Sequence, residues 1–160
     1  MTNLTQTTFF ISGTLPPKSS EMLSILVMGI GESGQAMAKW AHAQGAQVTM
    51  HDTREQSAIS AKIQKQLQEF QDLGIKITYG KDAAFSLLGI DMIAMSPGIS
   101  PLDSWIKNIF NQAKENGIVI WGELDFFTHA IHALKETQSY QPKVVAITGT
   151  NGKTTTTALC

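Results

Sequence analysis

Cysteine is almost absent from this 160-residue chain, whose single cysteine, Cys160, is the last residue of the sequence. A disulfide within the chain and a metal cluster built from several cysteines are therefore excluded. The lack of paired cysteines is typical of proteins from a reducing compartment. We accordingly expect a cytoplasmic protein.

An excess of one charge and a long apolar run are also missing. Twelve Lys and Arg residues oppose thirteen Asp and Glu residues, so no basic excess supports binding to nucleic acid. No apolar run approaches the roughly 18 residues that a membrane span needs. No Lys or Arg precedes the short apolar patch 9–11, which makes a poor secretion signal. We expect no nucleic-acid partner and no membrane insertion, and we interpret residues 1–23 as a flexible extension.

Short apolar runs alternate with amphipathic segments throughout the rest of the chain. The apolar runs predict five buried strands, at 25–28, 47–51, 76–79, 92–95 and 118–121. Helical spacing of apolar residues predicts helices at 35–44, 57–73, 102–113 and 123–134. This alternation predicts an α/β fold with a doubly wound parallel sheet and right-handed crossovers.

The C-terminal part of the sequence departs from this pattern. Residues 135–142 are polar and are interpreted as a linker, and the apolar run 144–147 predicts a further strand. Only three residues follow Thr157. We therefore expect one domain at 24–134, a linker at 135–142, and the truncated start of a second domain at 143–160.

A glycine-rich loop, Gly29–Gly34 (GIGESG), follows the first predicted strand and opens a helix. Glycines permit a tight turn and a close approach of the backbone to a phosphate, and the helix N-terminus offers free N–H groups. Asp52 ends the next strand, where dinucleotide folds hold a ribose. The loop predicts a nucleotide or diphosphate ligand, with a purely structural turn as the alternative, and it does not decide whether that ligand is NAD.

A second polar turn, Ser96-Pro97-Gly98, follows the fourth predicted strand. Open α/β sheets bind ligands at the carboxyl ends of their strands, where a Ser hydroxyl and a Gly N–H can hold a diphosphate. An ordinary proline turn explains the same residues.

A second candidate phosphate loop follows the run at 144–147. The backbone around Gly152 can wrap phosphate oxygens, Lys153 can reach the terminal phosphates, and the Thr154 hydroxyl can coordinate Mg²⁺. Ile147 stands five positions before Gly152, so the loop is a shorter variant of the G-x-x-x-x-G-K-[ST] pattern. We predict ATP and Mg²⁺ as cofactors, Lys153 and Thr154 as catalytic residues, and Thr154 as the metal ligand. The predicted ATP-binding residues are Gly149, Thr150, Asn151, Gly152, Lys153, Thr154 and Thr155.

Two such loops in this order resemble the Mur ligase family, over about residues 24–160. The ATP loop, AITGTNGKTTT at 146–156, is typical of the whole family and is shared with folylpolyglutamate synthase. Four further stretches resemble the branch that adds D-glutamate to UDP-N-acetylmuramoyl-L-alanine, and these are Met28–Gly34, Asp52–Arg54, Ser96–Ser100 and Trp121–Leu124. Residues 54–75 match only weakly.

The resemblance implies a Rossmann-like UDP-sugar domain followed by the truncated start of a P-loop ATPase domain. It implies a cytoplasmic, ATP-dependent acid–D-amino-acid ligase of peptidoglycan synthesis, which we expect to be a monomer. ATP phosphorylates the carboxylate of UDP-N-acetylmuramoyl-L-alanine to give an acyl phosphate, the amine of D-glutamate attacks it, and phosphate leaves. Asp52 and Thr53 are then expected at the uracil rather than at a ribose. The full set of expected UDP-sugar residues is Gly31, Glu32, Ser33, Gly34, Asp52, Thr53, Ser96, Pro97 and Gly98.

The resemblance also implies that further groups needed for ligation lie beyond residue 160. These are additional Mg²⁺ ligands, a modified lysine, a catalytic histidine and the D-glutamate site. We therefore predict that this chain alone has no ligase activity. Two alternatives stay open: an NAD-dependent oxidoreductase, which leaves the Lys153 loop unexplained, and a non-catalytic nucleotide-sugar binding module.

Overall fold

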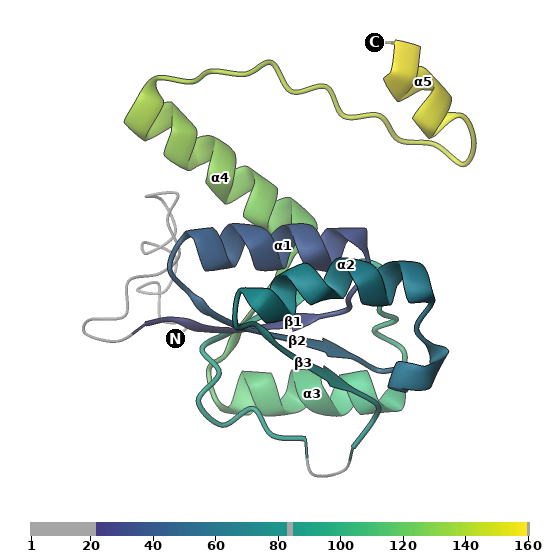
Figure 1. Ribbon diagram of the computed structural model, residues 1–160. Helices are drawn as coiled ribbons and strands as arrows, with labels where there is room; N and C mark the ends of the chain where they lie inside the picture. The colour runs from purple at the N-terminus through teal and green to yellow at the C-terminus, as the bar shows by residue number, and fades with distance from the viewer. Residues whose placement is uncertain (1–21, 83–84, 160) are drawn as a thin grey trace.

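The computed structural model describes residues 22–82 and 85–159, and its centre is a parallel five-stranded sheet (Figure 1). The strands are β1 (Ser24–Met28), β2 (Gln47–Asp52), β3 (Lys76–Tyr79), β4 (Met92–Met95) and β5 (Val119–Gly122). Their order across the sheet is β3-β2-β1-β4-β5. The chain adds β2 and β3 on one side of β1 and then adds β4 and β5 on the other side. The predicted doubly wound α/β sheet is therefore confirmed.

Helices cover both faces of the sheet. Figure 1 shows α1 (Glu32–Ala43), α2 (Ala61–Asp72) and α4 (Glu123–Gln138) on one face and α3 (Ser104–Glu115) on the other. The described ranges contain two further helical segments, the short 3₁₀ helix η2 (Gln56–Ala58) and α5 (Lys153–Leu159). None of the helices in the described ranges is long and apolar enough to cross a membrane.

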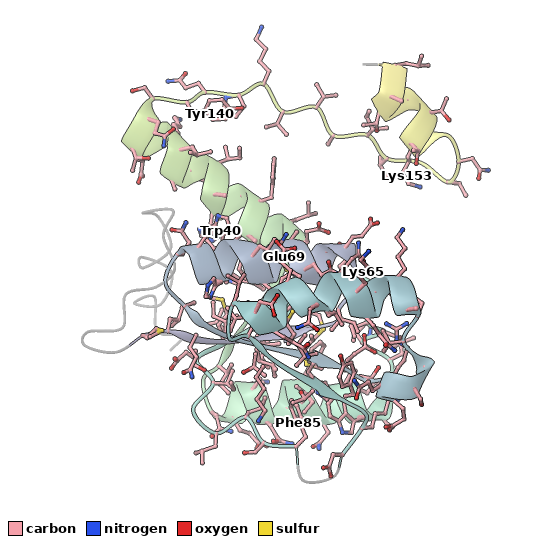
Figure 2. The ribbon with its side chains drawn as sticks, viewed as in Figure 1. Trp40, Lys65, Glu69, Phe85, Tyr140 and Lys153 are labelled. Carbon is pink, nitrogen blue, oxygen red and sulfur yellow. The ribbon has the colours of Figure 1, made fainter. Side chains whose placement is uncertain are left out.

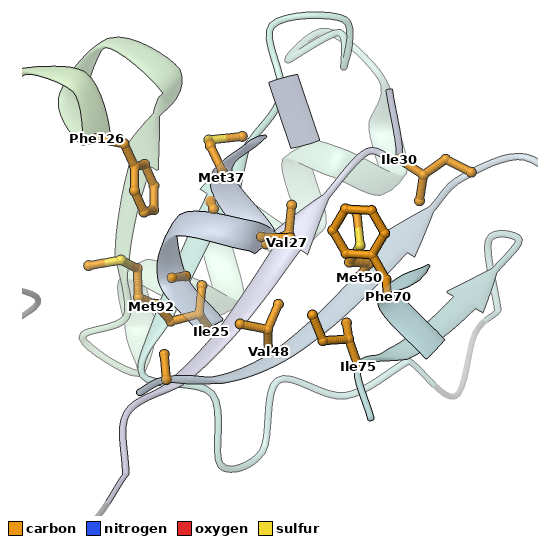
Figure 3. Packing of buried hydrophobic residues seen from close by; sticks show 14 of the residues in the cluster. Ile25, Val27, Ile30, Met37, Val48, Met50, Phe70, Ile75, Met92 and Phe126 are labelled. Carbon is orange, nitrogen blue, oxygen red and sulfur yellow. The ribbon is translucent and has the colours of Figure 1, made fainter. Parts of the chain in front are cut away.

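The core has two layers because successive side chains of a strand point to opposite faces. Ile25 and Val27 of β1 pack toward α1 and α2, in the cluster drawn in Figure 3. Leu26 and Met28 of the same strand pack toward α3. A strand buried on both faces contains an unbroken apolar run, which explains why β1 was recognisable in the sequence.

The helix expected at 57–73 is shorter in the structure, where η2 and α2 are separate. Ser60 is the N-cap residue of α2, and its Oγ accepts a hydrogen bond of 3.4 Å from the N–H of Ile63. Ile59 is buried although it precedes the helix. The apolar spacing that predicted one long helix therefore includes a core residue from the preceding turn.

The expected alternation of strands and helices fails between β3 and β4. The described residues 80–82 and 85–91 contain no helix. Gly80 and Gly89 both have positive φ, at 86° and 77°, which interrupts helical geometry. Leu87 lies buried against the α3 side of the sheet, so this connection covers the sheet without forming a helix.

The segment expected as a linker at 135–142 begins as a helix. α4 continues to Gln138, because Lys, Glu and Gln are good helix formers and polarity alone does not end a helix. The helix ends at Ser139, whose φ is 54°.

The strand expected at 144–147 is absent. Val144 and Val145 are 61% and 76% exposed. A strand requires a hydrogen-bonded neighbour, and the sheet described above ends at β3 and β5. In Figure 1, α5 stands apart from the sheet. The domain boundaries and the start of a P-loop ATPase domain stay predictions, and the extension predicted at 1–23 lies outside the described residues except for Met22 and Leu23.

Candidate functional site

A cavity of about 550 Å³ lies at the carboxyl edge of the sheet. Three segments line it: Gly29–Ser33 after β1, Asp52–Arg54 at the end of β2, and Ser96–Ile99 after β4. The order of the strands reverses between β1 and β4, which is where open α/β sheets bind their ligands. All of the residues predicted for the UDP-sugar line the cavity, with the exception of Gly34.

The loops after β1 and β4 approach each other closely at Gly29. Its φ is 99°, and its N–H donates to the His51 carbonyl at 2.7 Å. A Cβ atom on Gly29 would lie 2.8 Å from both Cβ and Oγ of Ser96. Only glycine fits here, so this residue brings two walls of the cavity together.

The N-terminus of α1 opens into the cavity without a side-chain cap. Its N-cap residue is Gly31, which makes no side-chain hydrogen bond. The first N–H groups of an α-helix have no acceptor within the helix. Ser60 and Asp103 cap α2 and α3 with their side chains. The uncapped turn of α1 can therefore hold an anion through its N–H groups and the helix dipole.

Gly34 packs the helix onto the strand instead of lining the cavity. A Cβ atom at this position would lie 2.0 Å from the carbonyl oxygen of Gly29. The expectation that Gly34 belongs to the site stays a prediction, and the structure gives the residue a supporting place beneath the loop.

Asp52 is buried and paired with Arg54. The Asp52 Oδ1 atom accepts from the Arg54 backbone N–H at 2.9 Å and from Nε at 2.8 Å, and Oδ2 accepts from Nη2 at 2.9 Å. Burial alone would raise the pKa of Asp52. The hydrogen bonds from Arg54, the positive charge of Arg54 and the hydrogen bond from the N–H of Ile30 outweigh burial, so the pKa is lowered. Asp52 is thus held as a carboxylate at the floor of the cavity.

Arg54 is a cavity residue that the sequence-based site did not include. Its side chain is half exposed, and its pairing with Asp52 fixes its direction. Ile99 also lines the cavity and was not predicted. An arginine two positions after a strand-ending aspartate is the signal that points to Arg54, whereas Ile99 had no distinguishing signal.

Ser96 contributes a polar group that has no protein partner. Its Oγ is buried, and no hydrogen-bond partner for it exists in the part of the chain that the structure describes. Buried hydroxyl groups are normally hydrogen-bonded, so this atom is suited to contact a polar ligand.

The predicted ATP-binding residues lie elsewhere. Figure 2 shows Lys153 on the segment that stands apart from the sheet. Its Nζ donates to the carbonyl of Gly149 at 2.5 Å, and Gly152 has a φ of 77°. Gly149–Thr155 are exposed wherever they are described. Within the described ranges, no group of three or more His, Cys, Asp or Glu side chains could hold a metal ion.

The chain has a doubly wound parallel sheet, a glycine loop after the first strand, and an uncapped helix N-terminus behind that loop. These features define a Rossmann-like α/β domain. The chain belongs to the Mur ligase family, because residues 23–122 match the domain described as Mur ligase MurD-like, N-terminal domain.

Relatives with curated names agree with this assignment. The UDP-N-acetylmuramoylalanine--D-glutamate ligase of Ralstonia nicotianae is 43% identical over 135 residues, which are 84% of this chain and 26% of that protein. The ligase of the same name from Cupriavidus pinatubonensis is 44% identical over the same shares. The chain thus spans about a quarter of the length of the curated relatives that it matches.

Among solved structures, shikimate dehydrogenase from Aquifex aeolicus shows a TM-score of 0.45 and 18% identity, over 77% of this chain and 51% of that one. A likeness of this degree carries no argument about function.

Proposed function

We propose that the cavity binds the uridine diphosphate part of UDP-N-acetylmuramoyl-L-alanine, and that the whole protein is the ATP-dependent ligase that adds D-glutamate to it. The observation that carries this proposal is the convergence of three loops, distant in the sequence, on one cavity at the reversal of strand order. The names of the relatives support the substrate and the reaction.

The uncapped N-terminal turn of α1 receives the diphosphate. Its N–H groups donate to phosphate oxygens, and the Ser96 hydroxyl adds a donor from the opposite wall. Asp52 and Thr53 receive the uracil, because an ionised carboxylate can accept a hydrogen bond from the ring N–H. Arg54 keeps Asp52 ionised. Pro97 and Gly98 close the wall after β4.

The segment that contains Lys153 and Thr154 fits an ATP-binding role. Gly152 already has positive φ, as a backbone that curves around phosphate needs, and the Lys153 ammonium contacts a backbone carbonyl instead of a carboxylate. Lys153 would contact the phosphates of bound ATP, and Thr154 would hold Mg²⁺ through its hydroxyl. ATP supplies the phosphoryl group that turns a carboxylate, which has a poor leaving group, into an acyl phosphate.

We expect the 160-residue polypeptide by itself to bind the UDP-sugar without ligating D-glutamate. It spans about a quarter of its relatives, and the resemblance puts the other ligation groups beyond residue 160. A phosphate-release assay with ATP, Mg²⁺, D-glutamate and UDP-N-acetylmuramoyl-L-alanine should show no turnover, and turnover would refute this expectation.

Calorimetric titration tests the binding proposal. UDP and UDP-N-acetylmuramoyl-L-alanine should bind the chain, and NADH should not. Ser96→Ala should weaken UDP binding by about tenfold or more, because a charge-assisted hydrogen bond to the anionic diphosphate is lost. Ser57→Ala in η2, outside the cavity, is the matched control and should leave UDP binding unchanged. Tight binding of NADH without binding of UDP would instead favour an oxidoreductase.

A further inference from the structure

Glu123 approaches the edge of the cavity from the end of β5, an edge strand of the sheet. It is the first residue of α4, and its Oε2 accepts a hydrogen bond of 2.8 Å from Oγ of Ser33, a residue ninety positions away in the sequence. Ser33 lines the cavity. The Glu123 carboxylate therefore lies beside the N-terminal turn of α1. Glu123 is not one of the site residues described above.

The direction of the Glu123 side chain is not explained by the start of its own helix. An acidic residue in the first turn of a helix often interacts with the free N–H groups there. In α4, Asp125 does this, because its Oδ2 accepts from the N–H of Gly122 at 2.7 Å. Glu123 instead crosses to α1, which suggests a role at the cavity.

The order of the strands places Glu123 at one end of the ligand path. At the carboxyl edge of the sheet the strand ends follow each other as β2, β1, β4 and β5. Asp52 lies at the end of β2, the open turn of α1 follows β1, and Glu123 follows β5. A ligand with its uracil at Asp52 and its diphosphate at α1 therefore extends its sugar toward the β4 and β5 side.

The chemistry of a carboxylate suits a sugar and opposes a phosphate. An ionised carboxylate only accepts hydrogen bonds, and phosphate oxygens also only accept. The hydroxyl and acetamido N–H groups of a hexosamine donate. Ser33 uses one of the roughly four lone-pair sites of the Glu123 carboxylate, and the others stay open to such donors. The same hydrogen bond turns the Ser33 proton away from the diphosphate.

We propose that Glu123 accepts hydrogen bonds from the hexosamine of the UDP-sugar and makes the site prefer UDP-hexosamines over UDP. This inference rests on the proposed function, since it requires the diphosphate to lie at the N-terminus of α1. Glu123 thereby sets specificity for the sugar and adds nothing to affinity for the nucleotide.

Titration of two probes, UDP and UDP-N-acetylglucosamine, tests the inference. Glu123→Ala should weaken binding of UDP-N-acetylglucosamine about tenfold and leave binding of UDP unchanged or tighter, because a charge-assisted hydrogen bond is lost while repulsion is relieved. Glu123→Gln should likewise leave UDP binding unchanged or tighter. Glu136→Gln, near the far end of the same helix, is the matched control and should leave both dissociation constants within about twofold.

The outcomes separate the inference from the function that underlies it. A wild-type chain that binds neither probe would overturn the proposed function, and the inference with it. The inference alone would be overturned if the wild-type chain binds UDP and the Glu123 variants change the dissociation constants of both probes equally, or change neither. Circular dichroism of each variant shows whether it is folded, and Ser33→Ala, which frees Glu123, should also reduce the preference for the hexosamine.

Discussion

At the scale of single residues, two glycines with similar places in the sequence have different physical tasks. Gly29 lets two walls of the cavity meet, and Gly34 lets α1 lie against the end of β1. The spacing of the glycines predicted a phosphate loop, and the structure puts a cavity there. The spacing does not reveal which glycine lines the cavity, because that depends on the distance between helix and strand in the folded chain.

Gly34→Ala should destabilise the protein strongly. The added Cβ would lie 2.0 Å from a backbone oxygen, so the helix must shift away from the strand. We expect a loss of about 2–3 kcal/mol in the free energy of unfolding, measured with urea. Gly98→Ala is the control, since a Cβ there meets open space, and it should change stability by less than about 0.5 kcal/mol. Equal effects of the two substitutions would contradict this explanation.

His51 makes stability depend on pH. Its ring is buried, stacked on Trp105 at 5.3 Å between centroids, and its Nδ1 lies 2.8 Å from Oγ1 of Thr78. Burial lowers the pKa of His51 below its usual 6.5, although the Gly80 carbonyl and Asp52 act in the opposite direction. The unfolded chain therefore binds more protons than the native chain below pH 6.5, and stability falls as the pH drops through that value.

Urea unfolding at several pH values between 7.5 and 5.5 tests this sign. The slope that His51 contributes should not exceed about 1.4 kcal/mol per pH unit. His51→Asn should flatten the dependence, and His132→Asn, at an exposed position of α4, should not. A stability that rises as the pH falls through this range would show that the direction is wrong.

At the scale of elements, the strands were easier to predict than the ends of the helices. β1 and β4 are buried on both faces, so their apolar runs match their bounds closely. Helix ends depend on single hydrogen bonds. The start of α2 is set by Ser60, and α4 extends past the expected residue 134 because polar helix formers follow it. Hydrophobic periodicity contains no information about such caps.

The cap of α3 offers a quantitative test. Asp103 Oδ1 accepts from the N–H groups of Trp105 and Ile106 at 2.9 and 3.4 Å, and Oδ2 pairs with Lys81. Asp103→Ala should lower the free energy of unfolding by about 1–2 kcal/mol. Ser60→Ala removes a single, longer cap bond from α2 and should cost less. A smaller loss for Asp103→Ala than for Ser60→Ala would contradict this order.

At the scale of the whole molecule, the sequence predicted most of the residues that line the cavity but not Arg54, and it did not predict the contact of Glu123 with the cavity residue Ser33. The loops after β1, β2 and β4 were identified separately, and the parallel sheet brings them together. The contacts of Arg54 with Asp52 and of Glu123 with Ser33 depend on the folded chain, and the sequence alone does not show them. The strand expected at 144–147 does not form. An apolar run becomes a strand only beside a hydrogen-bonded partner, and the described sheet offers none there.

Residues 143–159 should be dispensable for the domain that precedes them. Nearly all of their side chains are exposed, and α5 contains no buried residue. A chain that ends at Pro142 should keep the urea midpoint and the UDP affinity of the 160-residue chain within experimental error. Loss of either property would show that this segment packs against the domain in solution.

The length of α4 and of the segment after it limits the distance between the two candidate sites. At about 1.5 Å per residue, this sixteen-residue rod carries the chain roughly 24 Å from Glu123 to Gln138. The fourteen residues 139–152 form a tether that can extend about 46 Å. Because the tether is longer than the rod, Lys153 has enough reach to return to the end of α4 where Glu123 meets the cavity. The geometry of the chain thus permits the proposed ATP-binding loop and the proposed sugar end of the cavity to meet.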